Sequence, residues 1–120
     1  MIKNLFIVGI GGFIGTVFRF VLYHLLKTGQ PYINTFFINI IGSLAIGLII
    51  GISIKDVNFS NQWKPFLATG ICGGFTTFSA FSMENLKLIQ EGKYWIFLFY
   101  VLGSVLLGTL AAFIGFRITV

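Results

Sequence analysis

Residues 70–85 read GICGGFTTFSAFSMEN and interrupt a strongly apolar chain. The stretch contains three glycines, two threonines, two serines and three phenylalanines. Glycine raises the entropic cost of forming a helix, and threonine hydroxyls compete for backbone carbonyls. We therefore expect a helical break near Gly73–Thr77. Inside a membrane such a break must be surrounded by protein or line a cavity, because the freed carbonyls need partners.

The composition of the whole chain indicates a membrane protein. Of the 120 residues, 57% are hydrophobic and only 9% are charged, whereas about a quarter of the residues of a soluble domain are charged. Polar surface is therefore too scarce to cover a water-soluble globule. The net charge of +5 arises from basic residues scattered singly between apolar runs. This pattern argues against a nucleic-acid-binding patch and is typical of anchors at the membrane surface.

Four apolar segments are long enough to cross a bilayer, which requires about 20 mostly apolar residues. They cover residues 5–26, 35–54, 66–83 and 94–118. Polar or helix-breaking residues separate them, and Pro65 suits the first turn of the third helix. The expected fold is an all-α membrane protein, with residues 1–120 forming a single four-helix transmembrane domain.

The basic residues do not indicate which way the chain is inserted. Four spans place both termini on one side of the membrane. The positive residues divide evenly between the two sides: Lys3, Lys55, Lys64 and Arg117 on one, and Arg19, Lys27, Lys87 and Lys93 on the other. The positive-inside rule therefore gives no orientation. Either one unusual signal sets the orientation, or the protein inserts both ways.

Small residues at four-residue spacing predict faces where helices pack closely. Three spans carry such ridges: Gly11, Gly15 and Arg19; Asn39, Ser43, Gly47 and Gly51; and Tyr100, Ser104, Gly108 and Ala112. Four helices make a bundle too thin to enclose a wet path through its own centre. A pathway would arise at a subunit interface, so we expect at least a dimer, antiparallel if insertion is dual.

Two polar residues inside the spans allow more than one interpretation. Arg19 should face protein or water with a partner, or it lies near enough to the interface for its charged end to reach water. Asn39 either joins two helices by hydrogen bonds or serves a pathway. Neither possibility is excluded by the pattern of residues alone.

The chemistry of residues 70–85 permits contacts with both a cation and an anion. Carbonyls and hydroxyls at a break suit an alkali ion, because no carboxylate lies within an expected span and Glu84 falls just past the third. Phe78 and Phe81 are three residues apart and share a helical face. Their ring edges are electropositive and could contact a small anion without trapping it. Alternatively, the two rings only fill space between helices.

Three motifs resemble those of the Fluc (CrcB-type) fluoride channel family. GICGGFTTFSAFSMEN resembles the third-helix signature of that family. NTFFINIIGSLAIG, residues 34–47, resembles the second-helix pattern Gly-Thr-x-x-x-Asn-x-x-Gly, with Asn34 in place of the first glycine. GGFIGTVFRF, residues 11–20, resembles the first-helix pattern Gly-Gly-x-x-Gly-x-x-x-Arg. The resemblance extends over essentially the whole chain.

This resemblance implies an antiparallel, dual-topology homodimer in the inner (plasma) membrane, with two pores that passively export fluoride from the cytoplasm. The implied pore or fluoride-binding residues are Phe78, Phe81, Asn39, Thr35, Tyr100 and Ser104. A structural sodium ion at the dimer centre would be held by backbone carbonyls of Gly73 and Thr76. Arg19 would line a vestibule or its edge, and Glu84 would lie at the end of the third helix. Gly108 stands where some family members carry a further pore serine.

Two other functions remain as alternatives. A small proton-coupled multidrug exporter also has four spans and dual topology, but it should carry a membrane-embedded carboxylate, which no expected span contains. A structural membrane subunit would conduct nothing when purified. We expect no enzymatic activity, because the sequence offers neither a nucleophile–base pair nor a metal-binding cluster. The expected partners are a second copy of the chain, fluoride and membrane lipid.

Overall fold

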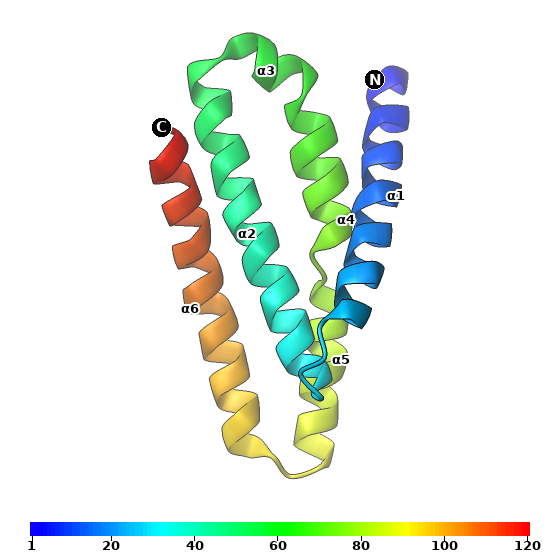
Figure 1. Cartoon of the computed structure of the whole chain (residues 1–120), viewed down its shortest axis with the longest axis vertical. Helices are drawn as coiled ribbons and strands as arrows, with labels where there is room; N and C mark the ends of the chain where they lie inside the picture. The colour runs from blue at the N-terminus through cyan, green and yellow to red at the C-terminus, as the bar shows by residue number, and fades with distance from the viewer.

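The computed structural model describes all 120 residues and is entirely helical (Figure 1). Four helical segments are long and apolar enough to span a membrane: α1 (Ile2–Leu25), α2 (Pro31–Lys55), the third segment (Pro65–Gln90) and α6 (Tyr94–Thr119). A short helix, α3 (Val57–Gln62), connects α2 to the third segment. Both termini lie at the same end of the molecule as α3 (Figure 1). The prediction of four helical spans is confirmed.

The third segment consists of three pieces. A π-helical stretch, η1 (Pro65–Cys72), continues into α4 (Gly73–Phe75), and α5 (Phe78–Gln90) follows after a gap. Thr76 and Thr77 occupy the gap in extended conformation, with ψ angles of 157° and 119°. The predicted break is therefore present, but it is narrower than expected because Gly73 and Gly74 remain helical.

Gly74 serves close packing rather than the break. A Cβ atom at Gly74 would overlap the carbonyl oxygen of Gly12 in α1. At Gly15, a Cβ atom would likewise overlap the carbonyl oxygen of Ile71. The small residues of the first span therefore bring α1 directly against the backbone of the third segment, where the two lie side by side (Figure 1).

The second close pairing joins α2 and α6, which run beside each other along most of their length (Figure 1). A Cβ atom at Gly47 would overlap the carbonyl oxygen of Ala112, and one at Gly51 would overlap the hydroxyl of Thr119. The expected small-residue face of the second span is thus confirmed. On α6 the contact extends beyond the expected ridge to Gly115, where a Cβ atom would overlap the carbonyl oxygen of Leu44.

The observed spans differ from the expected ones in one respect that affects function. The third segment does not end near Met83 but continues through α5 to Gln90. Glu84 therefore lies within the span and is only 7% exposed. The expectation that no carboxylate falls inside a span is wrong. The protein tolerates the buried side chain of Glu84 because both of its carboxylate oxygens accept hydrogen bonds from buried hydroxyls.

Candidate functional site

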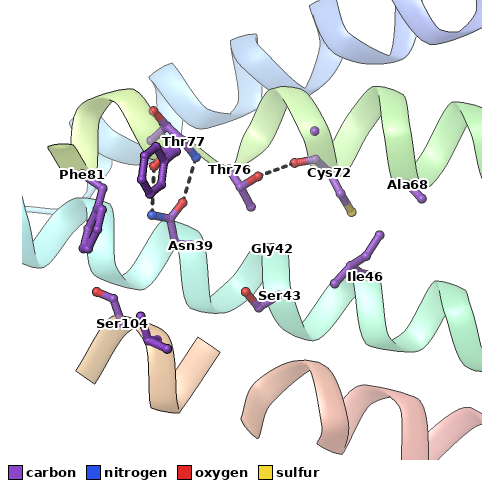
Figure 2. Close-up of a pocket in the computed structure, with 13 residues that line it drawn as sticks. Asn39, Gly42, Ser43, Ile46, Ala68, Cys72, Thr76, Thr77, Phe81 and Ser104 are labelled. Atoms are coloured by element: carbon purple, nitrogen blue, oxygen red, sulfur yellow. Dashed lines mark hydrogen bonds between the residues drawn. The ribbon is translucent and has the colours of Figure 1, made fainter. Parts of the chain in front are cut away.

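The break in the third segment is held by a side chain from α2. The amide nitrogen of Asn39, Nδ2, donates to the carbonyl of Thr77 at 3.1 Å, and the N–H of Thr77 donates to Asn39 Oδ1 at 2.9 Å (Figure 2). Both polar backbone groups of Thr77 are thereby satisfied in a conformation that gives them no helical partner. Asn39 therefore joins two helices by hydrogen bonds, which was one of the two interpretations of its position.

The threonines complete the capping of the break from within the chain. Thr77 Oγ1 accepts from the N–H of Ala80 at 3.1 Å, as an N-cap of α5. Thr76 Oγ1 donates to the carbonyl of Cys72 at 2.9 Å (Figure 2). The two residues that interrupt the helix thus also supply hydrogen bonds that its ends need.

On the opposite side of the break, α1 contributes the positively charged side chain of Arg19. Arg19 Nε donates to the carbonyl of Gly74 at 3.1 Å, and Thr16 Oγ1 approaches the same oxygen at 3.5 Å. A positive charge beside carbonyls at the end of a helix is favourable. Arg19 therefore has a protein partner and is half-buried. Arg19 also lines a cavity of about 300 Å³ between α1, α2 and α5. Tyr23 and His24 line the same cavity.

Glu84 is the centre of a buried hydrogen-bonded cluster from three helices. Thr35 Oγ1 of α2 donates to Glu84 Oε2 at 2.6 Å, and Tyr100 Oη of α6 donates to Glu84 Oε1 at 2.7 Å. Thr35 is 1% exposed and Tyr100 is 6% exposed. Such short bonds are typical of hydroxyls that donate to a carboxylate. The cluster joins α2, α5 and α6 and uses two hydroxyls that the family resemblance assigned to the anion path.

The apolar pattern of the sequence does not predict the role of Glu84 at the centre of this cluster, because the expected third span ends at residue 83. No proline or glycine occurs between Met83 and Gln90. That absence of helix breakers was the available signal that α5 continues.

The two phenylalanines of the third segment occupy different environments. The ring of Phe81 lies edge-on to that of Tyr100, with centroids 4.9 Å apart and an interplanar angle of 61°. Phe78 lies 5.7 Å from Phe81 between ring centroids, yet its side chain is 79% exposed. Phe81 is thus adjacent to the Glu84 cluster, whereas Phe78 lies beside Phe81 but is largely exposed.

A groove of about 430 Å³ runs along the break between α2, the third segment and α6 (Figure 2). Its lining includes four predicted pathway residues: Asn39, Phe78, Phe81 and Ser104. The hydroxyl oxygen of Ser104 is buried and has no hydrogen-bond partner. Ser43 also lines the groove, and its position four residues after Asn39 was the signal for this in the sequence. Thr35 and Tyr100 lie outside the lining, at the Glu84 cluster, and Gly108 is not part of it either.

The carbonyls of Gly73 and Thr76 suit the alkali ion that the family resemblance implies. In a continuous helix the carbonyl of Gly73 would accept from the N–H of Thr77, but that N–H donates to Asn39 instead. Thr76 is extended, so its carbonyl lies outside the helical pattern. Both residues border the groove. Neutral oxygen donors of this kind match the preference of a hard monovalent cation.

A family model and individual relatives of known name both match nearly the whole chain. Residues 6–116 match the family model described as CrcB-like protein, Camphor Resistance (CrcB). A relative from Azobacteroides pseudotrichonymphae genomovar. CFP2 is 41% identical, with 99% of this chain and 98% of the relative aligned. A relative from Leptospira interrogans (strain Fiocruz L1-130) is 41% identical over 94% of this chain and 91% of its own. One from Campylobacter jejuni (strain 81-176) is 40% identical over 98% of both. All three are named "Fluoride-specific ion channel FluC".

Proposed function

The chain belongs to the CrcB-like family, and from this membership we propose that it is a membrane channel specific for fluoride. The observation that carries the proposal is the 41% identity, over 99% of the chain, to a relative named as a fluoride-specific ion channel. The resemblance drawn from three motifs is thereby confirmed. An ion channel conducts passively and needs no catalytic group.

The chemistry of the groove supports a path for a small anion. The groove offers the second N–H of the Asn39 amide, which is not used by Thr77, the unpartnered hydroxyl of Ser104 and the rings of Phe78 and Phe81. No lysine or arginine is among its lining residues. Neutral donors and ring edges attract an anion weakly enough to release it, which conduction requires.

The Glu84 cluster sets a condition on the rest of the path. Thr35 and Tyr100 already donate their hydroxyl hydrogens to Glu84. A fluoride ion that uses these hydroxyls must therefore displace the carboxylate oxygens from them. In this view Glu84 keeps the two hydroxyls oriented and satisfied until an anion takes its place.

A second copy of the chain would complete the pore. The groove is open to the outside of the chain and carries Phe78 at 79% exposure, and only 17 of 120 residues are buried. Protein or lipid must cover the remaining apolar surface. The even division of basic residues supports an antiparallel arrangement, and hence dual topology in the inner membrane. A sodium ion on the carbonyls of Gly73 and Thr76 would supply a fixed positive charge beside the groove.

Fluoride efflux from proteoliposomes that contain only this protein tests the function. We expect passive release of fluoride, read with a fluoride electrode, while a chloride electrode detects almost no chloride release. Phe81→Ile should abolish fluoride release because it removes the ring that faces Tyr100. Phe113→Ile is the matched control, since Phe113 is 58% exposed on α6 and does not line the groove.

The same vesicles distinguish the other candidate functions. Because Glu84 lies within a span, the absence of an embedded carboxylate no longer argues against a proton-coupled exporter. Transport that requires a pH gradient would support an exporter. Equal release of chloride and fluoride would refute the proposed selectivity, and release of neither ion would favour a structural subunit.

A further inference from the structure

A second cavity lies on the side of the Glu84 cluster that faces water. It has a volume of about 150 Å³ and opens where α2 begins and α5 ends. Its floor includes Glu84 and Leu88, which are 7% and 4% exposed. Lys87, Glu91 and Lys93 form an exposed rim around it. The cavity therefore extends from the solvent-exposed end of the third segment to the buried carboxylate.

Two of the four charged residues that line this cavity form an ion pair, and the other two do not. Lys93 Nζ lies 3.2 Å from Glu91 Oε2, so these two residues form an ion pair. Lys87 forms no ion pair, and Glu84 is hydrogen-bonded only to neutral hydroxyls. Lys87 and Glu84 are three residues apart in α5, which places them on the same face of the helix. The lining holds two lysines and two glutamates, so its formal charge is zero, and Lys87 is the lysine that is not paired with a glutamate.

We propose that this cavity is a mouth through which fluoride passes between water and the Thr35–Glu84–Tyr100 cluster, and that Lys87 is the residue that admits the anion. The inference rests on the proposed function. An anion that approaches the cluster meets the charge of Glu84, and without Lys87 the cavity would carry a net charge of −1. A neutral cavity removes this electrostatic barrier without binding the ion tightly.

Opposite charge changes at the rim should change fluoride flux in opposite directions. In phosphatidylcholine vesicles at an ionic strength of about 10 mM, we expect Lys87→Gln to lower the initial fluoride efflux roughly twofold and Glu91→Gln to raise it roughly twofold. Both differences should shrink when about 0.3 M of an impermeant salt is added, because salt screens exposed charges. Lys87→Arg keeps the charge and should restore the original flux.

Lys55→Gln provides the matched control. It removes the same charge from the last turn at the other end of α2, away from the cavity. Efflux from this variant should equal that of the unmodified protein at low salt. The inference is overturned if Lys55→Gln lowers the flux as much as Lys87→Gln, or if Lys87→Gln and Glu91→Gln change the flux in the same direction or not at all. Absence of fluoride efflux from the unmodified protein would instead overturn the proposed function, and this inference with it.

Discussion

Asn39 and Thr77 form two hydrogen bonds, in which the side-chain amide of one residue pairs with both polar backbone groups of the other. The interaction joins α2 to the point where the third segment changes from helix to extended chain (Figure 2). It also leaves the carbonyl of Gly73 without the donor that a continuous helix would provide. The geometry of the break is thus determined by a residue 38 positions earlier in the chain.

Substitution of Asn39 should destabilise the break. Asn39→Leu removes both bonds and leaves the half-buried backbone groups of Thr77 without partners, which should lower the free energy of unfolding by about 2–3 kcal/mol. Asn39→Asp keeps the acceptor but places a carboxylate oxygen against the carbonyl of Thr77, so it should lower the stability at least as much. Denaturant titration in detergent measures both changes. Ser43→Ala, which also alters the groove lining but removes no hydrogen bond made by this chain, is the control; an equal loss there would contradict the prediction.

The Glu84 cluster should behave as one energetic unit. Glu84→Gln weakens the acceptor of two hydroxyl bonds, and Tyr100→Phe removes one donor; each should cost about 1–2 kcal/mol of stability. Because the two residues share a bond, their effects should not add, and a double-mutant cycle should give a coupling energy of about 1 kcal/mol. Strict additivity of the two changes would show that the buried bond between them contributes little.

Arg19 should protect the end of α4. We expect Arg19→Met to increase amide hydrogen exchange at residues 76–79, because the carbonyl of Gly74 loses its charged donor. Arg19→Lys should restore part of the protection through its charge. Thr16→Val is the comparison variant: its hydroxyl lies 3.5 Å from the same carbonyl, so its loss should cost less than about 0.5 kcal/mol. Unchanged exchange in Arg19→Met would refute this role.

The contact between α2 and α6 should not tolerate a methyl group at Gly47. A Cβ atom there overlaps the backbone of Ala112, so Gly47→Ala must separate the helices and should cost about 2 kcal/mol or more. Gly103→Ala is the matched change, since the nearest atom to its Cβ would be Phe36 Cε2 at 4.0 Å. It should be neutral or stabilising by up to about 1 kcal/mol, because alanine favours helices. Similar thermal stability of the two variants would contradict this assignment of the contact.

Dual insertion can be tested by labelling from the two sides of the membrane. In a Cys72→Ser background, Thr28→Cys places a single reactive thiol in the connection between α1 and α2. We expect a membrane-impermeant maleimide to label similar amounts of protein from either side of the cell membrane. Labelling from one side only would establish a fixed orientation and contradict the antiparallel homodimer.

Several features of the site could be predicted because they depend on local chemistry. The break at Thr76 and Thr77 follows from residues that favour non-helical backbone. The positions of Asn39, Phe78, Phe81 and Ser104 along one groove agree with the motifs that suggested a pathway. The end of the third span was less predictable. A glutamate that follows an apolar run normally marks the end of a membrane span, and only its hydrogen-bond partners show that this one is buried. Thr35 and Tyr100 are those partners, 49 and 16 residues away in the sequence.

The sequence by itself determined that this chain has four helices long and apolar enough to cross a membrane, because the length that a crossing requires is set by the thickness of the bilayer and needs no tertiary contact. Only the tertiary structure decided what the polar residues do within those helices. Asn39 turned out to hold the backbone of Thr77, and Arg19 to contact the carbonyl of Gly74. The physical reason is that a hydrogen bond inside a membrane protein needs its partner within about 3 Å, and helix packing alone brings such distant residues together.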